Sequence, residues 1–277
     1  MVLTTYREYG PLPALAPWVK CLWEMRCDEG GATVPMRVLP DGWVDLAVYV
    51  QPGPLPAPLN GSTTSAAVIV GLLSAPLQFE LPRGLHIVGA CMPAEAMRGL
   101  YGAELREFTG RLIPIADVRP RDLLAEEIAD GPPALAMFRL VAALEGRRRT
   151  ARPGSSLVSN AVRLVRREPG LIIVRDLAAQ LAISTRQLER HFLRELGLTP
   201  KHFARIVRFD RTVREIQSVV RLTWSQVALR HGYYDQAHPI REFRAFAQVT
   251  PAQYARPLLG AVTSHFYNTD AAVAGRL

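Results

Sequence analysis

The sequence predicts a two-domain α+β protein: a β-rich N-terminal domain with trailing helices, then an all-α domain of two helix-turn-helix units joined by a long helix. Three observations carry this prediction. Residues 34–92 hold short β-favouring runs separated by Gly and Pro. The chain after residue 156 follows a helical apolar period. Within it, residues 181–203 and 232–254 repeat one pattern at a spacing of 51 residues.

The expected strands begin in VPMRVLPDGWVDLAVYV, where Pro40-Asp41-Gly42 predicts a tight turn between two β-favouring runs. A Pro-rich loop is expected at residues 51–65. Further strands are expected in AAVIVGLL (66–73), FEL (79–81) and LHIVGACM (85–92).

The pattern turns helical after residue 93, in PAEAMRGLYG, IADVRPRDLLAEEIAD and PPALAMFRLVAALEG. The last of these helices places an apolar stripe on one face. We interpret this stripe either as core or as a dimer seam. Its members are Leu135, Phe138, Val141 and Ala142, with Met137, Leu140 and Leu144 close by.

The net charge of +8 is unevenly distributed along the chain. Residues 1–146 hold 11 Lys and Arg against 16 Asp and Glu, whereas residues 155–257 hold 17 against 8. A basic domain joined to a mildly acidic one is typical of a polyanion-binding module with a partner domain. The alternative is a general preference for arginine, since the chain has only two lysines. The expected organisation is a domain at 1–146, a linker at 147–156, a domain at 157–257 and a tail at 258–277.

The composition excludes several classes of protein. A chain of 277 residues that is 49% apolar is long enough for two folded domains. No apolar run reaches the roughly 18–20 residues of a membrane-spanning helix, and the start of the chain lacks the pattern of a signal peptide. Three cysteines are too few for a disulfide framework. We therefore expect a cytoplasmic protein with no membrane partner.

The helices expected after residue 156 alternate with short connections. Ser184 is the predicted N-cap of one helix, and Gly197 its C-terminal stop. Thr199-Pro200 is a cap followed by proline at the first helical position. The expected helices are 157–167, 175–181, 184–196, 200–218, 223–230, 235–247 and 250–255.

The second and third of these segments, 175–181 and 184–196, form the first candidate DNA-binding unit. Leu188 and Phe192 stand four residues apart and face inward, which leaves Arg186, Glu189, Arg190 and Leu193 on the opposite face. This is a helix-turn-helix pattern, whose second helix enters the major groove. Arginine suits guanine O6 and N7, and glutamate accepts from cytosine N4.

The second copy repeats the design with one extra residue in its turn. Ile240, Phe243 and Phe246 are its expected apolar positions, and the remaining side chains point outward. Pro239 stands where the first copy has Leu188. If Asp235 caps the helix, the proline removes one hydrogen bond, so we expect a widened first turn or a helix that begins nearer Pro239. The expected outward set is Gln236, Ala237, His238, Arg241 and Arg244.

The connecting helix forms a rod between the two units. About 18 residues at roughly 1.5 Å each give about 27 Å, which suits two helices entering successive major grooves about 34 Å apart. Arginines decorate this rod, and we expect most to bridge to Asp210 or Glu215 and one or two to reach phosphate. They are Arg205, Arg208, Arg211 and Arg214.

Residues 157–257 resemble the DNA-binding domain of the AraC/XylS family of bacterial transcription regulators. The resemblance is carried by Asp176-Leu177-Ala178, Ala182-Ile183-Ser184, Leu188, Arg190, Phe192, Gly197, Thr199-Pro200, Arg208, Val227-Ala228, Gly232-Tyr233, Phe243, Thr250-Pro251 and Tyr254. It implies double-stranded DNA as the partner, with RNA polymerase and a second copy of the chain as further partners. The implied DNA-binding residues are Ser184, Thr185, Arg186, Gln187, Glu189, Arg190, Arg194, Gln236, Ala237, His238, Arg241 and Arg244.

The N-terminal part resembles the sensor domains of such regulators, which are often cupin-like β-barrels that bind an effector or mediate dimerisation. The resemblance lies in Leu39-Pro40-Asp41-Gly42, Asp45-Leu46, Val88-Gly89 and Pro93-Ala94. It implies a small-molecule effector; the alternative is a protein-interaction module without a ligand, in which the aromatic side chains are core. The candidate effector-binding residues are Trp23, Trp43, Tyr49 and Phe79.

Two enzyme classes are disfavoured. A cupin-type metal enzyme fused to a DNA-binding domain needs two or three histidines and a carboxylate as metal ligands. Residues 1–146 contain a single histidine, His86. A zinc-bound repair domain needs four clustered thiolates, whereas Cys21, Cys27 and Cys91 are scattered. We therefore predict no catalytic residue, no metal and no cofactor.

Overall fold

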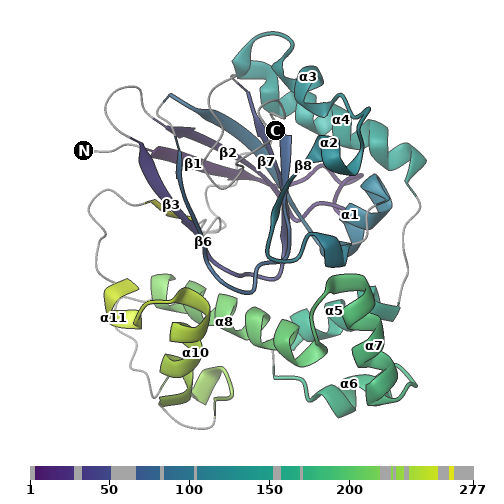
Figure 1. The fold of residues 1–277 in the computed structure, drawn as a ribbon, viewed down its shortest axis with the longest axis vertical. Helices are drawn as coiled ribbons and strands as arrows, with labels where there is room; N and C mark the ends of the chain where they lie inside the picture. Colours follow the sequence, from purple (N-terminus) through teal and green to yellow (C-terminus); the bar gives the residue numbers. More distant parts are fainter. Residues whose placement is uncertain are drawn as a thin grey trace.

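The computed structural model describes residues 4–27, 33–50, 67–81, 84–102, 105–151, 157–168, 171–218, 226, 229–233, 237–254 and 262–264. The strands and the helices up to α4 fill one part of the molecule, and the later helices form a second part beneath it (Figure 1). The predicted α+β class, with a β-rich domain preceding an all-α domain, is confirmed.

The strands form two sheets, and the larger is antiparallel throughout. Its strands in spatial order are β1 (Thr4–Tyr9), β2 (Cys21–Cys27), β7 (His86–Met92), β4 (Val44–Tyr49), β5 (Ala67–Val70) and β8 (Leu112–Pro114). The smaller sheet contains β6 (Leu77–Leu81), β3 (Val34–Val38) and β9 (Val262–Ser264).

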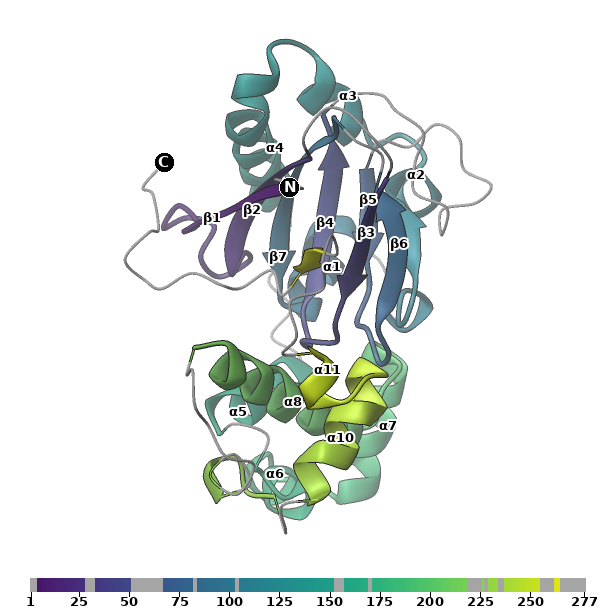
Figure 2. The same cartoon turned by 90° about the vertical axis from the view of Figure 1, so that its left-hand side faces the viewer.

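The central strands of the larger sheet are buried on both faces. Every residue of β7 and of β4 is buried, because helices cover one face and the smaller sheet covers the other (Figures 1 and 2). Leu46 and Ala90 belong to the cluster under the helices, whereas Ala47 and Cys91, their neighbours in sequence, belong to the cluster between the sheets. The two facing sheets give the expected cupin-like arrangement.

The strand predictions are confirmed between residues 34 and 92, including the turn between β3 and β4. Four of the described strands were not predicted: β1, β2, β8 and β9. Charged residues interrupt the apolar pattern in TTYREY and CLWEMRC, so neither segment shows a continuous β-favouring run. β9 lies in the expected tail and pairs in parallel with β3.

The helices of the first part lie along one side of the larger sheet (Figure 1). The segment expected as one helix at 115–130 is two helices with Pro120 between them. The helices are α1 (Ala94–Tyr101), η2 (Leu105–Glu107), α2 (Ile115–Val118), α3 (Leu124–Ala129), η3 (Pro133–Leu135) and α4 (Ala136–Thr150).

The apolar face predicted for α4 is corrected by the structure. Its buried stripe is Ala136, Met137, Leu140, Val141 and Leu144. Leu135 precedes the helix and is 48% exposed, and Phe138 is 57% exposed. The stripe at 137, 140, 141 and 144 has the ideal i, i+3, i+4, i+7 spacing and packs on the sheet. The helix continues to Thr150, so four residues of the expected linker are helical, and residues 152–156 lie outside the described part.

The second part matches the expected helices closely. The expected stop at Pro169-Gly170 and most of the helix at 223–230 lie outside the described residues. The helices are α5 (Leu157–Arg167), α6 (Val174–Gln180), α7 (Thr185–Leu196), α8 (Pro200–Ser218), α10 (Ala237–Ala247) and α11 (Pro251–Tyr254).

The core of this part is aromatic. Phe192, Phe203, Phe209, Phe243 and Phe246 are fully buried. The ring of Phe209 lies 5.4 Å from that of Phe243 and 5.2 Å from that of Phe246, which is the spacing of favourable aromatic pairs. These contacts hold α10 against the middle of α8, whereas the Phe192–Phe203 pair, at 6.2 Å, joins α7 to its start.

A buried carboxylate also fastens α10 to α8. The Glu242 side chain is 1% exposed, and it accepts hydrogen bonds from Arg205 Nε at 2.9 Å and Arg208 Nη2 at 2.8 Å. Arg208 also lies 4.6 Å from the centre of the Tyr233 ring. The two guanidinium groups compensate the desolvated carboxylate, as a buried charge requires.

We expect Glu242→Ala to loosen the second unit, because it leaves Arg208 without its carboxylate partner in a mostly buried site. A loss of about 3 kcal/mol is typical of such a change. Hydrogen exchange should become faster in α10 amides and stay unchanged in α7 amides. The matched control is Glu189→Ala, which removes an exposed carboxylate. Equal exchange rates in the two variants would contradict this account.

A second buried carboxyl lies in the β domain. Burial raises the pKa of Asp45 to about 8, and nearby Asp41 adds to this effect, while a hydrogen bond from Trp23 Nε1 to Asp45 Oδ1 (3.0 Å) opposes it. The unfolded carboxyl has a pKa near 3.9. The folded state therefore holds more protons between about pH 4 and pH 8, and its stability falls as the pH rises through this window.

We expect Asp45→Asn to remove this pH dependence, because the amide oxygen still accepts from Trp23 but carries no charge. The wild-type protein should lose up to about 1.4 kcal/mol per pH unit relative to the variant between pH 4 and pH 8. Melting temperatures of both proteins across this range provide the measurement. Parallel curves would show that Asp45 does not titrate in this window.

Candidate nucleic-acid interface

The first helix-turn-helix consists of α6, a turn and α7. Ala182 has a positive φ of 54° in this turn. Ser184 Oγ accepts from the backbone N–H of Gln187, and Gln187 Oε1 accepts from the backbone N–H of Ser184 at 2.9 Å. This capping box satisfies the first turn of the helix. It uses both side chains, so Ser184 and Gln187, which sequence placed in the DNA-binding set, act in the helix cap.

The outward face of α7 carries the predicted base-reading residues. Arg186, Glu189 and Arg190 are exposed, while Leu188 and Phe192 are fully buried on the opposite face. Within the described part of the chain, these three charged side chains make no hydrogen bond or ion pair with a neighbouring side chain. The helix therefore presents two guanidinium groups and a carboxylate to solvent, and Thr185 is exposed beside them.

Arg194 lies apart from this set. Its Nη2 lies 3.0 Å from Glu195 Oε1 and 2.8 Å from His191 Nδ1. Glu195 also faces Arg98 of α1, at 3.4 Å. Arg194 therefore lies at the end of α7 that contacts the β domain, away from the end with Arg186.

The second recognition helix is α10. Ala237, Arg241 and Arg244 are exposed, and Arg241 occupies the position equivalent to Arg190. His238 is half-buried, with its ring 5.2 Å from that of Tyr233 and its Nε2 3.9 Å from Glu242 Oε2. Gln236 lies outside the described residues.

Pro239 is the third residue of α10 and is buried. Residues 234–236, which include the expected cap Asp235, lie outside the described part of the chain. The expected widening of the first turn, and the alternative of a later start, are therefore not tested.

A basic groove lies between α6, the first half of α8 and the start of α10, and it was not predicted. It has a volume of about 660 Å³. Arg175 enters it from α6, Lys201 and Arg205 from α8, and His238 from α10. Their donors can bind the oxygens of a phosphate backbone. Lys201 follows Thr199-Pro200 directly. A cation in the first turn of the connecting rod is the sequence signal that indicates this candidate phosphate-binding position.

The arginines of the rod are mostly engaged inside the protein. Arg214 pairs with Asp210 at 3.0 Å, as expected. Arg211 donates to the backbone carbonyl of Arg166. Arg205 and Arg208 pair with Glu242, which sequence analysis did not foresee.

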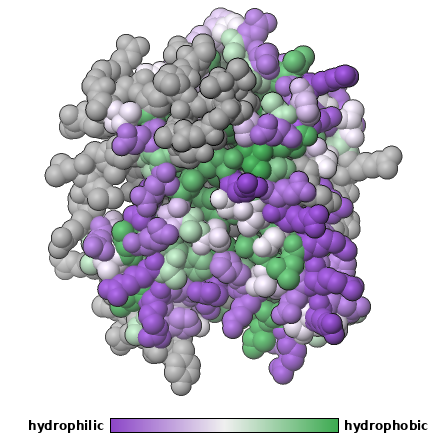
Figure 3. Space-filling model, in the orientation of Figure 1, coloured by the Kyte–Doolittle hydropathy of each residue, from purple (hydrophilic) through white to green (hydrophobic). Residues whose placement is uncertain are grey.

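Glu215, the other expected partner of the rod arginines, instead pairs with Arg230 and His231. Figure 3 shows hydrophilic residues over much of the helical part, with apolar residues gathered near the middle of the view, over the strands.

Three of the four candidate effector-binding residues lie together. Trp23, Tyr49 and Phe79 line a cavity of about 30 Å³ between the two sheets, together with Met25, Met36 and Asp45. Trp43 does not line it and instead contacts the helical domain. The three cysteines are buried and form no disulfide bond. The described residues contain no group of three His, Cys, Asp or Glu side chains that could hold a metal ion.

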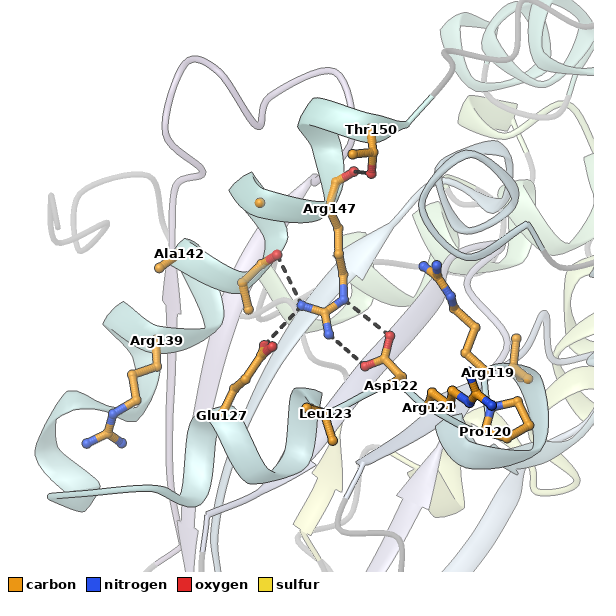
Figure 4. A pocket seen from close by; sticks show the side chains of 13 residues that line it. Arg119, Pro120, Arg121, Asp122, Leu123, Glu127, Arg139, Ala142, Arg147 and Thr150 are labelled. Atoms are coloured by element: carbon orange, nitrogen blue, oxygen red, sulfur yellow. Dashed lines mark hydrogen bonds and ion pairs between the residues drawn. The ribbon is translucent and has the colours of Figure 1, made fainter.

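A larger groove of about 1010 Å³ lies beside α4, where Arg147 joins Asp122 at 2.6 Å and Glu127 at 3.2 Å (Figure 4). Leu123, Ala142 and Gly146 also line it. This groove is remote from the recognition helices. Among the described residues, no helix is long and apolar enough to cross a membrane.

Two families match the chain. Residues 177–257 match a family described as a helix-turn-helix domain, and residues 7–114 match a domain of unknown function (DUF6597). A search of the curated proteins finds none that matches.

Among solved structures, the chain is similar to ToxT from Vibrio cholerae. One ToxT structure is 9% identical with a TM-score of 0.40, and the match covers 91% of this chain and 96% of that one. A second, bound to (E)-4-(8-methylnaphthalen-1-yl)but-3-enoic acid, is 11% identical with a TM-score of 0.44, covering 91% and 97%. A third, bound to an unsaturated fatty acid, is 12% identical with a TM-score of 0.42, covering 95% and 97%.

The helix-turn-helix match falls on the residues that form α6, α7, α8 and α10. The described geometry provides two exposed recognition helices on one connecting rod, as the repeated sequence predicted. The chain therefore contains a helix-turn-helix domain at residues 177–257, preceded by a domain of unknown function at residues 7–114.

Proposed function

We propose that the protein recognises a specific DNA sequence by placing α7 and α10 in successive major grooves. The observation that carries this proposal is that Arg190 and Arg241 are both exposed and occupy equivalent positions of the two recognition helices. Arginine at such positions binds guanine O6 and N7 in a bidentate manner. Arg186 and Glu189 extend the readout on α7, and Ala237 and Arg244 extend it on α10.

The basic groove between the helices supplies affinity in this proposal. Arg175 and Lys201 are exposed at the starts of α6 and α8, where they face the sugar–phosphate backbone between the two grooves. Phosphate contacts give sequence-independent, salt-dependent binding. His238, which lines this groove, contacts the backbone rather than a base.

The first unit is the stronger reader. Its helix begins with a complete capping box and ends at Gly197, which has a left-handed φ of 69° suited to glycine. The second unit places Gln248, with a φ of 56°, at the equivalent position, where a side chain makes that conformation costly. The base contacts of α7 should therefore dominate specificity.

The N-terminal domain regulates DNA binding in this proposal, through a small effector in the cavity between the sheets or through dimerisation. Trp23, Tyr49 and Phe79 support the first route, with Met25 and Met36 as walls that adapt their shape. The exposed Phe138 and the groove beside α4 support the second route, because a second copy would cover both. RNA polymerase is the further partner expected of a regulator.

We expect Arg190→Ala to reduce binding to the cognate site by about 1–3 kcal/mol and to relax preference at one base position. The site is first selected from random duplexes, and single-base variants are then titrated with both proteins. Arg149→Ala, which removes an exposed arginine of α4, controls for the change in charge. Equal weakening on every duplex would assign Arg190 to phosphate.

We expect an effector to raise the melting temperature, since a ligand of the folded state stabilises it by mass action. The protein is screened against fractionated metabolite pools, and an active pool is repeated on Ala47→Val. The two added methyl groups project into the cavity and should abolish the shift. A shift that persists in this variant would place the ligand elsewhere, and no shift from any pool would favour the interaction module.

A further inference from the structure

The N-terminal domain contacts both recognition helices at equivalent positions. Thr109 Oγ1 donates to the backbone carbonyl of Leu196, the last residue of α7, at 2.6 Å. Arg37 Nη2 donates to the backbone carbonyl of Ala247, the last residue of α10. Leu196 and Ala247 are 51 residues apart, which is the spacing of the sequence repeat.

The aromatic residues that close the two repeats also lie near the N-terminal domain. Phe203 and Tyr254 are again 51 residues apart. A methyl group at Gly42, whose φ is +80°, would lie 3.4 Å from the Phe203 ring, so the turn after β3 sits directly on it. Burial lowers the pKa of Arg37, and the nearby Tyr254 opposes this effect.

The approach at Thr109 is equally close. A methyl group at Gly197, whose φ is +69°, would lie 2.8 Å from Thr109 Oγ1 and 3.2 Å from the Arg106 Cα. The C-terminal end of α7 is therefore seated on the chain around η2. Helix C-termini present unsatisfied carbonyl groups, and at both recognition helices the N-terminal domain donates to one of them.

Strand β3 also faces the cavity between the sheets. Met36 and Val38 line that cavity, and Arg37 lies between them on the opposite face of the strand. One strand thus carries cavity-lining residues and a contact to the end of α10. A shift of β3 that accommodates a ligand would move Arg37 and the turn that follows it.

We propose that Arg37 and Thr109 are positioning residues for DNA recognition, holding the two recognition helices at one relative orientation by their C-terminal carbonyl groups. This inference rests on the proposed reading of bases by α7 and α10. Two anchored helices fit one spacing of their DNA segments. Release of the anchors lets each helix adjust separately, so the chain tolerates other spacings.

The test uses the full chain and DNA duplexes of known spacing. A preferred site is selected from random duplexes with the wild-type protein and footprinted. Duplexes are then made with one base pair inserted or deleted between the two contacted segments, which changes their separation by about 3.4 Å and their relative twist by about 35°. Binding to each duplex is titrated with the wild-type protein and with Arg37→Met/Thr109→Val.

Two control substitutions match the chemistry of the test variant. Arg26→Met removes a guanidinium group that pairs with Glu24 on the same strand. Thr33→Val removes a hydroxyl that donates to Glu80 within the smaller sheet. Both contacts lie inside the N-terminal domain, and neither residue belongs to a proposed binding site.

The wild-type protein and the control double variant should bind the altered spacings much more weakly than the selected one. For Arg37→Met/Thr109→Val, affinity for the selected duplex should fall about tenfold, the equivalent of two lost hydrogen bonds. The penalty for a one-base-pair change should fall severalfold at the same time. An unchanged penalty, with or without a uniform loss of affinity, would overturn the proposal.

Two further measurements keep this result separate from others. If the double variant does not fold, Thr109→Val alone, which preserves side-chain volume, should reduce the spacing penalty in part, and an unchanged penalty would again overturn the proposal. Arg190→Ala and Arg241→Ala are titrated in parallel. If neither weakens binding, the proposed reading of bases fails; if both do and the spacing penalty stays unchanged in the test variant, only the positioning role fails.

Discussion

The contact between Arg166 and the turn after β3 determines how the two domains are joined. The guanidinium carbon of Arg166 lies 3.2 Å from the centre of the Trp43 ring, and its Nη2 donates to the carbonyl of Gly42 at 2.5 Å. Arginine stacks on aromatic faces while keeping donors at its edge. Because Phe203 packs under the same turn, one apolar cluster runs from the sheet into α8. The two domains are therefore packed together through these side-chain contacts.

Buried charges explain why the helical domain offers fewer cations to DNA than its composition suggests. Arg205 and Arg208 pair with Glu242, and Arg214 pairs with Asp210. Without these partners, burial of the two charged carboxylates would carry a high desolvation cost. These arginines fix α10 on the rod and seat the rod near the β domain. Among the described residues of this domain, exposed cations lie at helix starts and on the outward faces of α7 and α10. Charge counted along the sequence thus overstates the charge of the interface.

The two helix-turn-helix units have the same arrangement of helices but differ in the interactions that stabilise it. The first has a complete cap and a glycine at its end, whereas the second uses Gln248 in a left-handed conformation and relies on Glu242 for its seat. The weaker local sequence signals of the second unit are thus supplemented by tertiary contacts, including the hydrogen bond from Arg37. The N-terminal domain, which in our proposal senses an effector, therefore also contacts α10. This is the recognition helix with the weaker local sequence signals.

The sequence by itself determined the features that depend on near neighbours. The cap at Ser184, the stop at Gly197, the burial of Leu188 and Phe192 and the exposure of Arg186 and Arg190 all follow from residues within one or two helical turns. The tertiary structure decided which face of α4 is buried, where Trp43 lies and how the basic groove is lined. Each of these features depends on contacts between chain segments that are far apart in sequence. The local periodicity of the sequence does not encode such contacts. The pairing of Arg37 with the end of α10, 210 residues away, is the clearest case.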